Sequence, residues 1–249
     1  MNAPLQYVAE ISQVREVSLI GTADLAFWTE RLQREKLFPT AVDGQAQILI
    51  SGTSANFKGI PFQELSISVF VSREERRAER EGAFLTQAFN SNWFFALVER
   101  MWFATPYDLA RVSVEATVPA SIQVKQHGQI AFRSAMAEQG IAQRQAIRCG
   151  NEGWEGPIFL PGRRRLAGDK WFYARIGGQT SVYPFLPDRD ELTIRPELGP
   201  PAIAWLVQSH FAGRQWIIRD SAVHAKSKTY ARHAACAFPA LQPALAAAE

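Results

Sequence analysis

Residues 64–71 read ELSISVFV, and their polarity alternates almost from one position to the next. Successive side chains of a β-strand point to opposite sides of its sheet, so this alternation predicts a strand. Its aliphatic face must pack on an apolar core; that face comprises Leu65, Ile67, Val69 and Val71. The opposite face begins with Glu64 and continues with two serines. That face must therefore meet either solvent or a polar interior.

Shorter segments around this strand show related patterns. Strands are expected at 14–21, 46–51, 83–88, 110–118 and 214–224, and hairpins around His127-Gly128 and Gly177-Gly178. One helix is expected to begin near residue 22 and to end before Pro39. A second helix, over about residues 92–105, is apolar around most of its circumference and is expected to be largely buried. Residues 201–211 fit either a helix or a strand.

Many short alternating strands with few helices predict an α+β fold, mainly an antiparallel, barrel-like sheet. We expect one domain over residues 1–249, with its core at about 14–230 and a frayed tail at 234–249, where the sequence is rich in Ala and Pro and shows no core pattern.

Composition excludes several classes of protein. The chain has 249 residues, of which 47% are hydrophobic and 20% charged, which is typical of a globular protein. Its net charge of +3 arises from scattered residues, and the dense stretch 73–81 mixes both signs, so no nucleic-acid surface is expected. No apolar run is long enough to cross a membrane, and the amino-terminal residues do not resemble a secretory signal. We therefore expect a cytoplasmic protein.

Cysteines and cofactor motifs give no sign of a metal or a nucleotide. Cys149 and Cys236 stand alone, without the spacing of a zinc site or a disulfide framework. The sequence lacks GxSxG, P-loop, GxGxxG and HExxH motifs. The expected partner is a small molecule, with no cofactor, metal, nucleic acid or membrane.

Two segments stand out as places where chemistry is expected. GIPFQE, residues 59–64, leads into the alternating strand, and ERMWFATPYDLA, residues 99–110, joins an apolar helix to a strand through a proline turn. In their order and spacing these segments resemble the acetoacetate decarboxylase-like superfamily, from about residue 14 to about residue 230. The resemblance implies a cone-like β-barrel with a largely apolar interior, which is often assembled into oligomers. It also implies that Glu64 faces the interior.

The chain departs from this family at the reacting residue. In the decarboxylases a lysine after the turn proline forms a Schiff base with a β-keto acid. Here the two positions after Pro106 are Tyr107 and Asp108, and neither side chain can form an imine. Lys58, Lys125 and Lys170 remain as candidates for a relocated amine.

The candidate site residues are therefore Glu64, Tyr107, Asp108 and Arg111. Glu64 would act as a general acid or base whose pKa burial raises, and Tyr107 would donate a hydrogen bond to a carbonyl or enolate oxygen. Asp108 or Arg111 would orient the substrate. For each residue a structural role stays open: a solvent-facing carboxylate, a core tyrosine or a surface ion pair.

The four histidines are scattered, and we expect them to lie at the surface or in satisfied structural contacts: His127, His210, His224 and His233. His224, in a predicted strand, is the least secure of these assignments. The roles of His210, His224 and Lys170 are left open.

The sequence thus favours an enzyme that acts on a hydrophobic carbonyl compound by non-covalent acid/base chemistry. Lyase, dehydratase, isomerase and cyclase reactions, including those of specialised metabolism, all fit this description. The alternatives are a non-catalytic binding protein for a hydrophobic metabolite and a decarboxylase with a relocated lysine. A homo-oligomer is expected.

Overall fold

The computed structural model describes residues 5–75, 80–138, 144–162 and 170–231. The helices are α1 (Leu25–Leu32), α2 (Trp93–Trp102) and α3 (Pro201–Gln208), with 3₁₀ turns at Gln33–Glu35 and Pro196–Leu198. The long strands are β1 (Tyr7–Asp24), β4 (Gln45–Phe57), β5 (Ile60–Ser72), β6 (Gly82–Asn90), β11 (Arg148–Phe159), β12 (Lys170–Pro184) and β14 (Ala212–Ser227). The shorter strands are β2 (Phe38–Pro39), β3 (Ala41–Val42), β7 (Tyr107–Leu109), β8 (Arg111–Glu115), β9 (Ser121–Gln126), β10 (Gln129–Ala135), β13 (Glu191–Ile194) and β15 (Tyr230–Ala231).

The seven long strands form a ring. They pair in the order β5, β4, β1, β14, β12, β11 and β6, and β6 pairs in turn with β5. The pairings return to their starting strand, which is the topology of a barrel. Within the ring every pairing is antiparallel except that of β6 with β11. The expected α+β fold with a mainly antiparallel barrel is confirmed.

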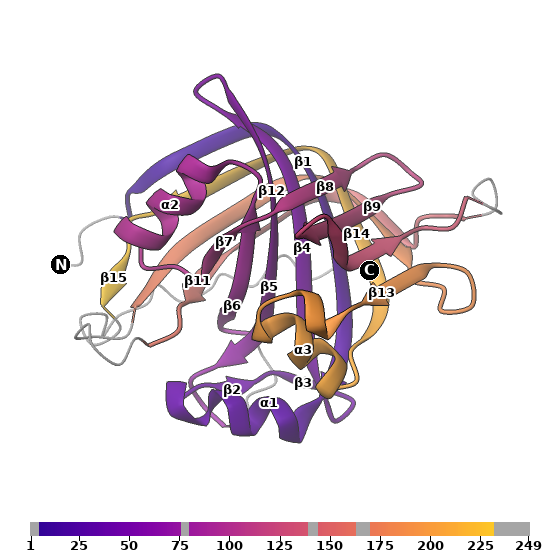
Figure 1. The fold of residues 1–249 in the computed structure, drawn as a ribbon, viewed down its shortest axis with the longest axis horizontal. Coiled ribbons are helices and arrows are strands. Elements are labelled where there is room, and N and C mark those ends of the chain that lie inside the picture. Colours follow the sequence, from indigo (N-terminus) through magenta and orange to yellow (C-terminus); the bar gives the residue numbers. More distant parts are fainter. Residues whose placement is uncertain (1–4, 76–79, 139–143, 163–169, 232–249) are drawn as a thin grey trace, which may run out of the picture.

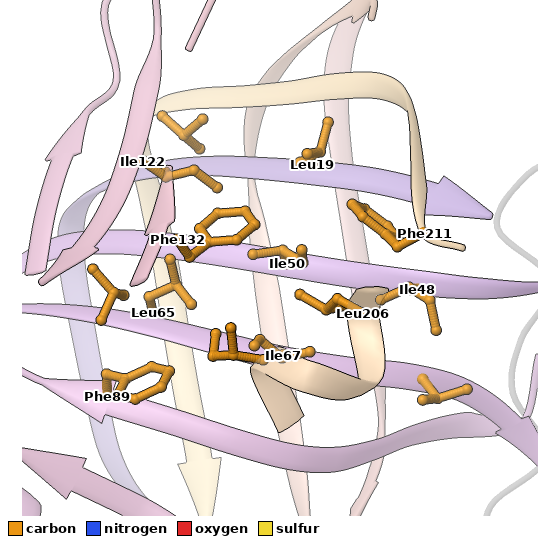
Figure 2. Packing of buried hydrophobic residues seen from close by; sticks show 14 of the residues in the cluster. Leu19, Ile48, Ile50, Leu65, Ile67, Phe89, Ile122, Phe132, Leu206 and Phe211 are labelled. Carbon is orange, nitrogen blue, oxygen red and sulfur yellow. The ribbon is translucent and has the colours of Figure 1, made fainter. Parts of the chain in front are cut away.

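The aliphatic face of β5 points outward from the ring. A second sheet, in the order β13, β10, β9 and β8, covers that face together with α1 and α3. Figure 2 shows Ile50, Leu65 and Ile67 of the ring opposite Ile122 and Phe132 of the second sheet and Leu206 of α3. Figure 1 shows α1 and α3 together at one end of the strands, with α2 toward the other end. The main hydrophobic core therefore lies outside the ring.

The other face of β5 points into the ring. Ile20, Phe70 and Ala83 form one buried cluster, against which Leu49, Ile158 and Ile217 also pack. These side chains come from six strands, and some of those strands are not neighbours in the ring. They can meet only across its interior. Glu64, Ser66 and Ser68 share the face of Phe70 on β5, so they also face inward.

Helix α2 differs from the sequence prediction. Asn92 caps it by accepting hydrogen bonds from the backbone N–H groups of Phe94 and Phe95. Only Ala96 is fully buried, whereas Trp93 and Trp102 are 64% and 80% exposed. The prediction of a largely buried helix is wrong because α2 packs through one side on β6 and β7, and through Phe95 on Phe57 and Phe62, while its other side stays exposed.

The predicted hairpin at Gly177-Gly178 is also wrong. β12 runs straight through both glycines and pairs with β11 along its length. Its register against β14 shifts between Gly177 and Ser181, so the pair marks a bulge rather than a turn. Gly178 has φ +150°, and an added Cβ would lie 3.1 Å from the Ala222 Cα. The other hairpin is confirmed, with His127 and Gly128 at positive φ between β9 and β10.

Residues 201–208 are helical, and Trp205 of α3 packs edge-on against Trp28 of α1. No helix of the described residues is long and apolar enough to span a membrane. The predicted frayed tail, residues 234–249, lies outside the described residues.

Candidate functional site

Strands β5 and β6 place Glu64 at the inner wall of the ring. Glu64 pairs in register with Asn90, whose side-chain Nδ2 donates to Glu64 Oε2 over 3.3 Å. The residue as a whole is intermediate in exposure. The preceding motif, residues 59–62, lies in the turn and the start of β5, before the strand enters the ring.

Tyr107 reaches the same place from the turn after α2. Thr105 closes the end of the helix, since its hydroxyl donates to the Glu99 carbonyl oxygen over 2.7 Å. The chain then continues as β7, parallel to β6, with Tyr107 in register with Ala88. The buried phenol donates its hydroxyl hydrogen to the Glu64 carboxylate. The structure thus brings together Glu64 and Tyr107, from two elements that are more than forty residues apart.

An ion pair completes this cluster. The Lys226 ammonium group on β14 donates to Glu99 Oε1 over 2.7 Å and to Glu99 Oε2 over 2.5 Å. The same nitrogen lies over the rings of Phe103 and Phe172, 4.5 and 4.4 Å from their centroids. The side chains of Glu99 and Lys226 are 18% and 19% exposed, so the pair is largely shielded from water and yet accessible.

These neighbours set the protonation of Glu64. Burial raises the pKa of the Glu64 carboxyl group, and the negative charge of Glu99 raises it further. The hydrogen bond from Tyr107, the charge of Lys226 and the hydrogen bond from Asn90 oppose this rise without cancelling it. A carboxyl group with a raised pKa exchanges protons closer to neutral pH than an ordinary glutamate does.

Tyr107 remains a proton donor. Burial, followed by the negative charges of Glu64 and Glu99, raises the pKa of the phenol well above its ordinary value. The phenol therefore keeps its proton at neutral pH and can donate it in a hydrogen bond to an oxygen.

The structure does not bring Asp108 or Arg111 into this cluster. Strand alternation turns Asp108 to the face opposite Tyr107, where Gln87 donates to it over 3.1 Å. Its carboxylate also lies 3.9 Å from an Arg100 nitrogen. Arg111 is exposed on β8, on the side opposite the buried Val112.

The sequence analysis did not identify Glu99 and Lys226 as members of this site. Glu99 was not a candidate site residue, and the candidate lysines were Lys58, Lys125 and Lys170. The predicted strand ended at residue 224, whereas β14 continues to Ser227 and places Lys226 on the same face as His224. No local pattern indicates that this face points into the ring. Within the described ranges no group of three His, Cys, Asp or Glu side chains is arranged to hold a metal ion.

The balance of charges around Glu64 can be tested without a substrate. Glu99→Gln removes a negative charge that raises the Glu64 pKa, so this pKa should fall. Tyr107→Phe removes a hydrogen bond to the carboxylate, so the Glu64 pKa should rise. A ¹³C NMR titration of carboxyl-labelled glutamate would measure both changes, with Glu64→Gln used to assign the signal.

Glu115→Gln, on the exposed face of β8, serves as the control and should leave the titration of Glu64 unchanged. Shifts of the same sign in Glu99→Gln and Tyr107→Phe would contradict the described geometry.

Comparison with known proteins supports the fold. The sequence matches no protein-family model and no curated protein. The enduracididine biosynthesis enzyme MppR, solved with pyruvate, aligns with a TM-score of 0.61 at 11% identity over 92% of each chain. MppR complexed with the condensation product of pyruvate and imidazole 4-carboxaldehyde gives a TM-score of 0.60 at 11% identity over 93% of this chain and 90% of that one.

Acetoacetate decarboxylase from Legionella pneumophila subsp. pneumophila str. Philadelphia 1 gives a TM-score of 0.58 at 12% identity. The alignment covers 93% of this chain and 92% of that one. At these identities the likeness concerns the path of the chain rather than its chemistry. The ring of strands and these alignments together show that the chain has the acetoacetate decarboxylase-like fold.

Proposed function

We propose that this protein is an enzyme that moves protons on a small carbonyl compound bound inside the ring. The observation that carries this proposal is the hydrogen-bonded pair of Glu64 and Tyr107, a carboxyl group with a raised pKa beside a phenol that stays protonated. Groups with these properties are the usual partners in general acid/base catalysis. The structural neighbours, MppR with pyruvate and acetoacetate decarboxylase, support a carbonyl substrate.

The proposed step balances without a cofactor. The Glu64 carboxylate takes a proton from the carbon next to the substrate carbonyl, and the electron pair of the C–H bond moves to the carbonyl oxygen. As Glu64 becomes protonated, the single hydroxyl hydrogen of Tyr107 turns from the Glu64 carboxylate to the enolate oxygen that forms and donates a hydrogen bond to it. The Lys226 ammonium group lies close enough to Glu64 to lower its pKa, so it also stabilises negative charge at this place. Return of the proton from Glu64 to another atom completes the reaction.

The apolar lining favours a compact, hydrophobic substrate. Leu85, Leu160 and Phe172 pack around Tyr107 in one buried cluster. In such a setting a hydrogen bond or a charge acts more strongly than it does in water. Asp108 and Arg111 have no direct part in this step.

Hydrogen exchange on pyruvate tests this function. Wild-type protein in D₂O should replace the methyl hydrogens of pyruvate by deuterium, as followed by ¹H NMR. Glu64→Gln should reduce the exchange rate by roughly 10²–10⁴-fold, because the carbon then has no base. Tyr107→Phe should reduce the rate less, because the charge of Lys226 remains.

The exposed variant Glu115→Gln is the matched control and should exchange at the wild-type rate. Wild-type rates in both Glu64→Gln and Tyr107→Phe would rule out the proposed pair. Pyruvate that binds but shows no exchange would favour a binding protein.

One observation also favours a second function, which is imine chemistry by a relocated lysine. Lys226 lies inside the ring, and the Glu99 carboxylate contacts its ammonium group and is placed to accept its proton. The freed amine would attack the substrate carbonyl carbon, and loss of water would leave an imine. The described geometry of Lys226 supports it as this amine better than that of Lys125, which lies beside the turn of an outer hairpin.

Reductive trapping separates the two mechanisms. If Lys226 forms an imine, borohydride added with pyruvate should attach the substrate to the peptide that contains residue 226, as measured by mass spectrometry. Lys226→Met should lose the label, whereas Lys125→Met should keep it. A chain in which no lysine is labelled would reject this second function and leave the acid/base mechanism standing.

The exposed face of α2 supports the expected homo-oligomer, and we propose that a second copy of the chain covers it. Most of the large exposed apolar residues of the described chain cluster there and on the adjoining ends of β5 and β7: Ile60, Trp93, Phe94, Leu97, Met101, Trp102 and Leu109. A stable interface buries roughly 800 Å² per partner. Aromatic side chains bury about 150–250 Å² each, so this face is large enough for such an interface.

Charge placed on this face should separate the copies. Trp102→Glu with Met101→Glu is expected to reduce the mass measured by light scattering to that of one chain, because charged side chains would be buried in the interface. Val207→Glu, which alters an exposed apolar residue on α3, should leave the mass unchanged. A wild-type mass of 27.8 kDa would rule out this interface.

A further inference from the structure

A second set of ionisable groups lies on the inner wall of the ring, outside the Glu64 cluster. β14 places His224 two residues before Lys226, on the same face of the strand. The side chains at these two positions are therefore about 7 Å apart along the strand. His224 contacts Glu16, which pairs in register with Thr53, and Thr53 pairs with Glu64, so His224 and Glu64 lie at a similar level of the ring.

Glu16 holds the imidazole of His224 in place. The His224 Nε2 lies 3.0 Å from Glu16 Oε2. The other oxygen, Glu16 Oε1, accepts from Arg219 Nη1 over 2.9 Å and from the Ser18 hydroxyl over 2.8 Å. Glu16 is 2% exposed, so the carboxylate is almost completely enclosed by these donors.

A hydrogen bond to Thr180 holds the Arg219 side chain in place. Its Nε donates to the Thr180 hydroxyl over 2.8 Å, and the residue is only 8% exposed. The carboxylate–imidazole pair therefore rests on a rigid support that spans β1, β12 and β14.

The ionised state of Glu16 fixes the orientation of the imidazole. Burial opposes ionisation, but the hydrogen bond and charge of His224, together with Arg219, lower the pKa of Glu16 to about 2. An ionised carboxylate accepts hydrogen bonds only, so Nε2 must carry the hydrogen that points to it. Among the contacts found in the described part of the chain, Nδ1 has no hydrogen-bond partner. The His224 side chain is 22% exposed, so part of the imidazole is accessible.

We infer that His224 is a second catalytic acid/base residue of this enzyme, with Glu16 and Arg219 as its positioning residues. The inference rests on the proposed function, because it assumes that Glu64 removes a proton from carbon. A carboxylate that orients an imidazole by one nitrogen leaves the other nitrogen to exchange protons with substrate, as in hydrolase triads.

A second proton-transfer group extends the reaction class. When the carbon next to a carbonyl loses its proton to Glu64, a hydroxyl group on the following carbon can leave as the carbon–carbon double bond forms. The electron pair of the breaking C–O bond leaves with the oxygen, and protonated His224 gives its Nδ1 proton to that oxygen, which departs as water. The substrate class is therefore a β-hydroxy carbonyl compound, and the reaction is a dehydration or, in reverse, a hydration.

The charged groups around the imidazole lie on two strands, β1 and β14. Glu16 faces it from β1, and Arg219 and Lys226 lie before and after it on β14, while β12 contributes the apolar Ile176 at the paired position. Of these groups, only the Glu16 carboxylate contacts the imidazole directly.

The test uses 4-hydroxy-2-oxopentanoate as the probe, with dehydration followed by the ultraviolet absorbance of the conjugated product. His224→Gln should reduce the dehydration rate by roughly 10²–10⁴-fold while the exchange of the hydrogens on C3 continues, since Glu64 still acts on carbon. Added imidazole should restore dehydration in His224→Ala. His210→Gln, which alters an exposed histidine after α3, should dehydrate the probe at the wild-type rate.

Each failure has a separate meaning. Loss of C3 exchange in the wild type would reject the proposed function at Glu64. Exchange without dehydration in the wild type, or equal dehydration in His224→Gln and the wild type, would overturn the role of His224 alone. A ¹H–¹⁵N spectrum of the wild-type histidines needs no variant: a His224 ring that carries its hydrogen on Nδ1 and none on Nε2 would also overturn the inference.

Discussion

The two-sided pattern of β5 is the constraint on which the rest of the structure depends. Leu65 and Ile67 must be covered, and the second sheet and α3 cover them from outside the ring. Because side chains alternate along a strand, the same constraint turns Glu64 toward the inside. A shift of one residue in register would exchange the two faces and would put a carboxyl group into the main core. Core packing and the position of the reactive group are thus set by the same alternation.

Two glutamates on the inner wall have opposite protonation behaviour. Glu16 contacts an arginine and a histidine, and its pKa is lowered to about 2. Glu64 has a phenol, an amide and a second carboxylate as its surroundings, and its pKa is raised. Burial acts in the same direction on both groups, so the difference comes from the charges of their neighbours. The inner wall therefore carries a carboxylate that stays ionised at neutral pH and a carboxyl group whose pKa is raised.

Short stretches of sequence predicted the features that depend only on neighbouring residues, such as strand alternation and turns. The alternation of residues 64–71, the hairpin at His127-Gly128 and the turn that carries Tyr107 were all visible in short segments. The positions of Lys226 and His224 beside Glu99 and Glu16 could not be predicted, because they arise from ring closure, which joins β14 to β1 and β12. Helix α2 was expected to be buried because apolar content alone does not tell a core from a surface that a partner could cover. Gly177-Gly178 looked like a turn, since a bulge uses the same residues.

The pairing of β1 with β14 has a consequence for how the chain acquires its structure. These are the first and the last long strands, and together they complete the ring. During synthesis the strand that carries residues 212–227 leaves the ribosome late. Until then β1 and β12 each have one edge without its pairing strand. Contacts of such large sequence separation also slow folding in general. A nascent chain that stops short of residue 212 would lack Arg219, His224 and Lys226 together, and would leave the buried Glu16 without its contacts to Arg219 and His224.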